Sequence, residues 1–459
     1  MNGRMLYWIV MLIIASLFLS ACAQPAATQS LPTEFSPTEA PTEIMEEPTE
    51  APAETEEPVS TEEPMAEEAT VVVGFTSSLT GNQEVSSKRQ VNGFTLWMNE
   101  VNDSGGIALS DGTIVKFDFK TYDDESNTER VQELYARLIT EDNADFLISP
   151  YSSGLTSAAS IVAEQNGKVM ITAGAADDAA YQTGNTSLFQ LYTPGSLYMV
   201  STVDMLKELN PEAKIALVHE NDKFSTSVVE GIKPYLESNN FEVVLEEAYA
   251  TDTADFGPIV NKIASSGATI LLGGGHYNDG TALARSLYDR NIGLEFVYLL
   301  VAPADTKFLE LGDAALGIAT SSQWELDATH TEEEANNLGI EWYGPTGEEF
   351  ASAYQAAFGD PPTYHVAGGY AAGLILQKAI IDADSIEPDT VRAALNAMNI
   401  MTFYGGIQFD TSEEAHGLQI AHKMVVAQWQ LNEAGELVRV VIAPADVAIA
   451  EPLYPIPTH

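Results

Sequence analysis

Short apolar runs alternate with amphipathic stretches along the chain from residue 71 onwards. Residues 71–75 form a continuous apolar run typical of a buried strand, whereas residues 90–101 carry large apolar side chains at helical spacing. The same two patterns predict further strands at 114–122, 144–148, 168–172, 214–219, 242–246 and 268–272, and further helices at 128–140, 157–164, 225–238 and 255–264. The chain is therefore predicted to alternate strands with helices.

Strands that alternate with helices favour parallel sheets with helices on both faces. Two such series are present and separate near Thr193, so we expect an α/β protein with two doubly wound lobes. In sheets of this kind, ligands bind outside the carboxyl ends of the strands, where loops lead into helix N-termini. The loops that follow the predicted strands are therefore the candidate binding regions.

The first 22 residues have the pattern of a secretory signal. Arg4 precedes an apolar run from Leu6 to Leu19, which is too short to predict a membrane span, and small residues follow. Cys22 is the only cysteine, so no intramolecular disulfide can form. The Leu-Ser-Ala-Cys run resembles the lipobox of bacterial lipoproteins, which implies a lipidated Cys22 and a membrane anchor on the extracytoplasmic face. An ordinary signal peptide with a chance cysteine is the alternative.

Residues 23–70 are predicted to be a disordered linker rich in Pro, Thr and Glu. This stretch has 13 Glu and 8 Pro but no Lys, Arg or Asp. It has little apolar surface to bury, and like charges and Pro favour extended conformations. We expect a stalk that holds the body away from the membrane; a specific binding tail is the alternative.

The body of the chain, residues 71–459, is long enough to form two lobes, and its net charge limits the kinds of partner that it can bind. Residues 71–459 contain 54 acidic and 19 basic residues, a net charge of about −35. Such a surface repels nucleic acid, so we exclude a nucleic-acid function. We find no nucleophile elbow, zinc-protease motif, phosphate loop or catalytic Cys, so we predict neither an enzyme nor a cofactor.

Two polar or glycine-rich segments resemble sites only superficially. Residues 219–222, His-Glu-Asn-Asp, have at best the spacing of a loop metal site and are more typical of a polar strand end. The glycines at 273–275 do not continue into a dinucleotide-binding loop, because the required spacing fails at Asn278. We therefore predict no metal site.

Five motifs in order resemble the type I periplasmic binding proteins of ABC transporters, especially the leucine/isoleucine/valine-binding proteins. They are Ser78–Gly81 with Asn92-Gly93 and Glu100–Ile107, then Tyr122–Asp124, Ser152-Ser153, Ile171–Ala175 and Thr402–Asp410. The resemblance covers residues 71 to about 445. It implies two α/β lobes with ligand in the cleft, joined by crossovers near Tyr192-Thr193, Ser321-Ser322 and Met401–Phe403. One lobe is then 71–192 plus 323–402, and the other 193–322 plus 403–459.

The resemblance also implies where a ligand carboxylate is held in the first lobe. Serine hydroxyls and backbone N–H groups at helix starts do this in amino-acid binders of the family, since helix N-termini carry unpaired donors and partial positive charge. The matching positions are Ser152 and Ser153, ahead of the predicted helix at 157, and the Gly174, Ala175 and Ala176 backbone. The serines can equally be helix caps.

Other candidate positions lie around the cleft. Phe224 matches a family aromatic that covers the ligand, Ser86 stands where relatives have a bulkier residue, and His276 and Tyr277 follow a strand end. Each can instead belong to an ordinary loop or helix start. Lys88 and Arg89 can meet an anion, although Arg89 can equally face water.

Departures from the family pattern argue against a standard branched-chain amino acid. Ala176 replaces a family Thr, and the apolar residues 300–302 stand where relatives place an acidic partner for the ligand's ammonium group. A buried, unpaired ammonium costs several kcal/mol. Asp305 can take the role if the loop shifts; otherwise an amide, a urea-like solute or an organic acid fits better.

The resemblance implies the solute receptor of an ABC importer, with a small-molecule solute and the permease and ATPase subunits as its partners. A ligand-sensing lipoprotein that docks a signalling receptor is the alternative. A structural surface lipoprotein would explain the stalk but not the two lobes.

Overall fold

The computed structural model describes residues 67–457. The predicted signal peptide, the predicted lipid attachment at Cys22 and most of the predicted linker therefore lie outside the described residues. We predicted that the linker ends at residue 70, but the first strand already begins at Glu68. Residues 68–70 thus belong to the folded body.

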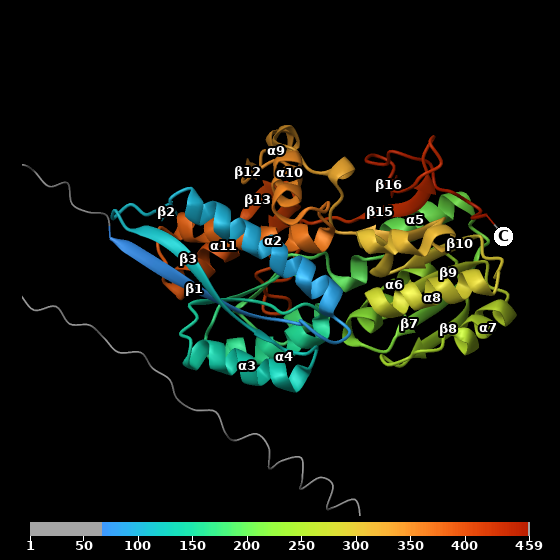
Figure 1. The fold of residues 1–459 in the computed structure, drawn as a ribbon, viewed down its shortest axis with the longest axis horizontal. Helices are drawn as coiled ribbons and strands as arrows, with labels where there is room; N and C mark the ends of the chain where they lie inside the picture. Colours follow the sequence, from blue (N-terminus) through green and yellow to red (C-terminus); the bar gives the residue numbers. More distant parts are fainter. Residues whose placement is uncertain (1–66, 458–459) are drawn as a thin grey trace, which may run out of the picture. The chain divides into compact units, whose positions relative to one another are not determined.

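The first lobe is built on a six-stranded sheet with the order β2-β3-β1-β4-β5-β6 (Figure 1). Its strands are β1 (Glu68–Ser77), β2 (Ile107–Ala108), β3 (Ile114–Asp123), β4 (Phe146–Ile148), β5 (Met170–Thr172) and β6 (Leu188–Gln190). Every neighbouring pair is parallel except β2 with β3. The connecting helices are α2 (Glu84–Asp103), α3 (Thr128–Thr140) and α4 (Ser153–Gln165).

Helix α11 (Tyr364–Ala383) returns late in the chain and packs along α2 (Figure 1). The two backbones approach closely at glycines. A Cβ on Gly93 would lie 1.9 Å from the Val366 carbonyl oxygen, and one on Gly369 would lie 2.0 Å from the Gln90 carbonyl oxygen. Any larger residue would force the helices apart, so these glycines fix the position of α2.

Around α11 lie further elements that complete the first lobe. They are helices α9 (Glu332–Leu338), α10 (Gly347–Phe358) and α12 (Pro388–Ala397), with a small sheet of β12 (Glu341–Trp342), β13 (Asn399–Thr402) and β14 (Gly405–Gln408). Aromatic rings join them: Phe350 of α10 stacks on Phe403 at 4.5 Å between ring centroids and contacts Tyr370 of α11.

The second lobe is built on a seven-stranded sheet with the order β16-β15-β11-β10-β9-β7-β8. Its strands are β7 (Lys214–Glu220), β8 (Glu242–Tyr249), β9 (Ile270–Gly274), β10 (Phe296–Leu299), β11 (Ile318–Ser322), β15 (Val425–Leu431) and β16 (Leu437–Ala443). Strands β7 to β11 pair in parallel, whereas β15 and β16 add an antiparallel edge. Its helices are α5 (Val200–Leu209), α6 (Lys223–Ser238), α7 (Gly257–Ser266) and α8 (Tyr277–Asp289). The predicted α/β class with two doubly wound lobes is confirmed.

Three crossings join the lobes, and side chains at the crossings bond to one another. The Thr193 N–H donates to Gln323 Oε1 at 3.0 Å, and Thr193 Oγ1 lies 2.9 Å from His422 Nδ1. Burial lowers the pKa of His422 to about 3, so its ring is neutral and takes part as a hydrogen-bonding group rather than as a charge. Thr193 at the first crossing is therefore hydrogen-bonded to residues near the second and third crossings.

The third crossing lies further along the chain than we predicted. Residues 399–408 form a hairpin in which β13 pairs with β14, so the chain turns back at Met401–Phe403 instead of leaving the lobe. The Gln190 N–H then donates to the Gly417 carbonyl oxygen, which ties this segment to β6. The predicted boundary at 403 is therefore wrong, because the chain reaches the second sheet only at Val425.

None of the helices in residues 67–457 is both long enough and apolar enough to span a membrane.

Candidate ligand-binding site

A cavity lies between the lobes where strand ends of both sheets meet. The first lobe lines it with Tyr151, Ser152, Ser153, Gly174, Ala176, Tyr192 and Tyr364, and the segment beyond the first crossing lines it with Tyr198, Phe224 and His276. Its interior has only about 10 Å³ of free space. Entry of a solute therefore requires the lobes to part. Six of the nine predicted positions lie here: Ser152, Ser153, Gly174, Ala176, Phe224 and His276.

The two serines begin helix α4, which starts at Ser153 and not near residue 157 as predicted. Ser152 is the N-cap, and its Oγ accepts from the Leu155 N–H at 3.5 Å. Its φ of 97° and ψ of 152° lie in a region that is essentially restricted to glycine. Such strain is typical of functional sites, where the surrounding structure holds a residue in an uncommon conformation.

Ser153 is fully buried and already bonds within the protein. Its Oγ accepts from the N–H groups of Ala176 and Asp177, both at 3.1 Å. The predicted availability of the Ala176 N–H to a ligand is therefore wrong, because Ser153 takes that donor. The hydroxyl proton of Ser153 can still be donated into the cavity.

Three of the predicted positions do not line the cavity. Ala175 is buried, and its carbonyl accepts from Gln190 Nε2 at 3.3 Å, on the side of β6. Burial raises the pKa of the Tyr151 phenol, and a hydrogen bond with Ser86 lowers it by less. Tyr277 is the first residue of α8 and lies near Asp305; burial and that carboxylate raise its pKa to about 12.

Of the two basic candidates, Lys88 is exposed and Arg89 is buried. Arg89 Nε donates to Asp305 Oδ2 at 3.3 Å, and its Nη1 pairs with Asp360. Burial lowers the pKa of Arg89, but the two carboxylates outweigh it and raise the pKa above its ordinary value. Both expectations are thereby corrected. Arg89 does not face water, and Asp305 forms an ion pair with Arg89 instead of with a ligand ammonium group.

Sequence analysis did not identify four tyrosines as site residues, although they line the cavity: Tyr151, Tyr192, Tyr198 and Tyr364. The ring of Tyr192 contacts that of Tyr364 at 5.7 Å, and the ring of Tyr198 contacts Phe224 at 5.3 Å, edge to face in both pairs. Burial raises the pKa of all of these phenols, so they are neutral. Tyr192 Oη is buried and has no hydrogen-bond partner among residues 67–457. A polar group of a ligand would satisfy it.

A chain of hydrogen bonds crosses the cavity between the lobes. His276 Nε2 lies 3.0 Å from Asp222 Oδ2, its Nδ1 lies 3.4 Å from Tyr151 Oη, and that hydroxyl lies 3.3 Å from His365 Nε2. Burial lowers the pKa of His276, but Asp222 outweighs it and raises the pKa to about 9. Burial lowers the pKa of His365 well below its ordinary value, so that ring is neutral.

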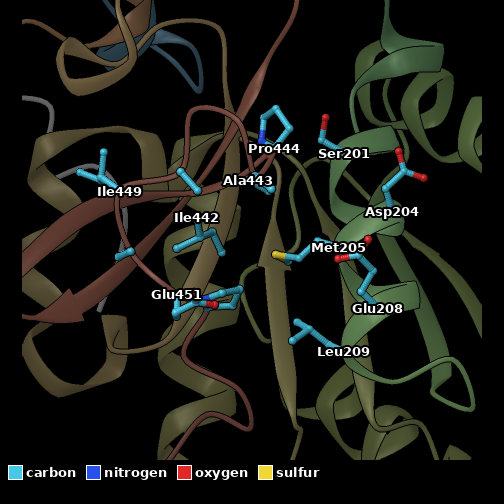
Figure 2. A pocket seen from close by; sticks show the side chains of 14 residues that line it. Ser201, Asp204, Met205, Glu208, Leu209, Ile442, Ala443, Pro444, Ile449 and Glu451 are labelled. Atoms are coloured by element: carbon cyan, nitrogen blue, oxygen red, sulfur yellow. The ribbon is translucent and has the colours of Figure 1, made fainter.

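A larger cavity lies on the second lobe alone, between α5 and the segment that follows β16 (Figure 2). Met205, Leu209, Ile442 and Ile449 line it, together with acidic residues such as Asp204. It contains none of the predicted site residues. Because its lining comes from one lobe, closure of the two lobes does not enclose a solute there.

Two hinged α/β lobes that enclose a small cavity define a class of proteins that trap a solute between domains. The chain belongs to the periplasmic binding protein family, whose family model matches residues 70–436. This confirms the resemblance seen in the sequence. The family is one of solute-binding proteins and not of enzymes.

The similar proteins include curated relatives and solved structures. Leu/Ile/Val-binding protein homolog 7 of Brucella melitensis is 23% identical over 398 residues, which cover 83% of this chain and 94% of that protein. The isoleucine complex of the substrate binding protein LivJ from Streptococcus pneumoniae has a TM-score of 0.67 at 19% identity and covers 82% of this chain and 100% of its own. A solute binding protein from R. palustris in complex with 4-hydroxybenzoate has the same TM-score at 18% identity, with coverage of 82% and 96%. These structures share the fold of this chain.

Proposed function

We propose that the chain is the solute receptor of an ABC importer, which binds a small polar solute outside the cytoplasmic membrane and delivers it to the permease and ATPase subunits. The observation that supports this most is the cavity itself, which residues of both lobes line. The transporter proteins among its structural neighbours have the same fold.

For the ligand, we propose an organic acid, with an aromatic carboxylate as the leading candidate. Among residues 67–457, none that lines the cavity is acidic, Leu300 to Ala302 are buried and apolar, and Asp305 pairs with Arg89. The ammonium group of an amino acid would therefore be buried without a carboxylate partner, at a cost of several kcal/mol. A carboxylate without an ammonium group avoids this cost.

The lining supplies complementary groups for such an acid. The N-terminus of α4 favours negative charge, and Ser153 beside it has a hydroxyl proton to donate. The rings of Tyr198 and Phe224 provide an apolar surface against which an aromatic ring can pack, and Tyr192 Oη can form a hydrogen bond with a polar substituent of that ring. Neighbours of the same fold were solved with benzoate and with 4-hydroxybenzoate.

Titration calorimetry with benzoate, 4-hydroxybenzoate and isoleucine tests the ligand class. The two aromatic acids are expected to bind at least about a hundredfold more tightly than isoleucine, since 1.4 kcal/mol corresponds to tenfold in Kd. Tighter binding of isoleucine would contradict the proposal and would mean that a carboxylate outside the present lining reaches the ammonium group.

We also propose that Cys22 carries a lipid anchor. Replacing Cys22 by Ser is expected to move the protein from the membrane fraction to the soluble fraction of its host, because acyl chains contribute about 0.8 kcal/mol per buried CH₂. Fractionation followed by detergent partitioning measures this. The neighbouring substitution Ser20→Ala keeps the cysteine and serves as the control. If Cys22→Ser stays in the membrane fraction, the anchor lies elsewhere.

The predicted linker is expected to be dispensable for binding. A shortened chain that begins at Pro64 keeps all of β1, which starts at Glu68, and should bind solute and melt like the chain that lacks only residues 1–22. Calorimetry and thermal melting compare the two. A loss of cooperative melting on shortening would show that the linker packs on the body.

A further inference from the structure

Two strand ends of the second lobe bring together metal-binding side chains beside the ligand cavity. Glu220 ends β7, Asp222 caps α6, and His276 follows β9 as the N-cap of α8. One potential ligand atom from each lies within 4.8 Å of the others. His219, which sequence analysis grouped with Glu220 and Asp222, points elsewhere: its Nδ1 bonds to the Glu220 carbonyl oxygen at 2.9 Å. His276 takes its place.

A second observation points to a missing partner at this cluster. Glu220 is only 4% exposed, and its Oε2 has no hydrogen-bond partner in the described part of the chain. Asp279 lies nearby: a Cβ on Gly275 would lie 2.4 Å from Glu220 Oε2 and 2.5 Å from Asp279 Oδ2, so the two oxygens are at most 4.9 Å apart. A buried carboxylate oxygen without a partner is costly. A cation next to Glu220 would remove that cost.

We propose that Glu220, Asp222 and His276 bind one divalent transition-metal cation, with Asp279 beside them. The distance from His276 Nε2 to Asp222 Oδ2 is 3.0 Å. Two ligands of a tetrahedral Zn²⁺, each about 2.0–2.1 Å from the metal, are about 3.3 Å apart, so the pair of His276 and Asp222 needs only a small shift. The ligand atom of Glu220 lies within 4.8 Å of the other two. One imidazole with carboxylates suits Zn²⁺ or Mn²⁺ better than Ca²⁺ or Mg²⁺, which favour oxygen ligands alone.

Outer contacts hold the proposed ligands in orientation. Asp222 Oδ1 accepts from the Ser225 N–H at 2.8 Å, and the hydroxyl of Tyr249 donates to Asp279. His276 Nδ1 faces Tyr151, so metal at Nε2 leaves the other ring nitrogen free to donate to that phenol. A separate opening lined by Asn82, Asp252 and Asp279 also reaches Glu220 and His276, and it provides an entry path.

This arrangement couples the metal to the solute cavity, because His276 belongs to both. Its ring lines the cavity on one side and bonds to Asp222 on the other. A metal fixed at Nε2 would hold the ring, and with it the hydroxyl of Tyr151, in place for the solute.

Calorimetric titration of the EDTA-treated chain with Zn²⁺ tests the proposal directly. The expected result is one equivalent of Zn²⁺, bound at least tenfold more weakly by Glu220→Gln. His330→Gln is the matched control, because His330 and Glu334 form a more exposed pair at 2.8 Å that can bind Zn²⁺ adventitiously. No stoichiometric binding by the unaltered chain, an unchanged Kd in Glu220→Gln, or a loss confined to His330→Gln would overturn the proposal.

Anomalous scattering from crystals of the unaltered chain soaked in Zn²⁺ provides a test that does not depend on a variant folding. A peak between Glu220, Asp222 and His276 is expected, and peaks only at other positions would overturn the proposal. Both readouts report metal, so their outcome is independent of whether the chain imports an organic acid.

Discussion

Replacing Asp305 by Asn is expected to weaken solute binding about ten- to a hundredfold. Arg89 lies on α2 of the first lobe, whereas Asp305 lies between β10 and β11 of the second, so their bond exists only when the lobes are together. A hydrogen bond to a charged group contributes about 1.5–3 kcal/mol. Its loss lowers the population of the closed form, and the apparent Kd rises in proportion. Calorimetry measures the Kd, and small-angle scattering measures the opening of the free protein.

Replacing Asp305 by Asn weakens the bond to Arg89 between the lobes without removing the other hydrogen bond that Asp305 accepts. Asp305 Oδ1 also accepts from the Lys307 N–H at 2.8 Å, and Asn retains that oxygen. Asp360→Asn is the matched control, because Asp360 meets the same guanidinium from the loop between α10 and α11 of the first lobe and is 39% exposed. That bond persists when the lobes part, so the Kd should change less than about threefold. Equal effects of the two variants would contradict a closure role for Arg89 and Asp305.

The apolar pattern predicted the sheets because buried parallel strands are short and almost wholly apolar. The run at 71–75 lies within β1, and the run at 268–272 overlaps β9. The pattern failed where polar side chains are buried. The first turns of α2 bury Ser86, Ser87, Arg89 and Gln90, which have no apolar periodicity, so the predicted helix began at 90 and Arg89 was assigned to solvent as one alternative.

The candidate site was predictable where its residues lie in loops after strand ends or match a motif of the family. Ser152 and Ser153 lie between β4 and the first turn of α4, and the resemblance to the family singled them out. The tyrosines of the cavity come from distant places: Tyr192 lies at a crossing, Tyr198 precedes α5, and Tyr364 begins α11. No local pattern joins these positions, and only the tertiary fold brings their rings together. The third crossing was misplaced for a related reason, since the hairpin of β13 and β14 depends on pairing that sequence spacing does not reveal.

Ser153→Ala is expected to reduce both the stability of the free protein and its affinity for solute. The hydroxyl oxygen of Ser153 accepts hydrogen bonds from two backbone N–H groups of the loop after β5. An alanine at this position would leave both donors buried without a partner. Each such donor costs about 1–3 kcal/mol. If the same hydroxyl donates to the ligand carboxylate, the affinity should also fall about ten- to a hundredfold. Urea unfolding without solute and calorimetry with the preferred acid separate the two effects.

Two variants in the same helix show which part of that effect belongs to Ser153. Ser152→Ala removes an N-cap whose bond to Leu155 is long, at 3.5 Å, so it should cost at most about 1 kcal/mol of stability. Ser157 lies one turn further along α4, and its Oγ has no hydrogen-bond partner within residues 67–457. Ser157→Ala should therefore change neither the free energy of unfolding nor that of solute binding by more than about 0.5 kcal/mol. A Ser153→Ala variant as stable as Ser157→Ala would mean that other groups hold the loop after β5. Lowered stability with an unchanged Kd would leave Ser153 as a structural residue and would assign the carboxylate to the backbone N–H groups of α4 alone.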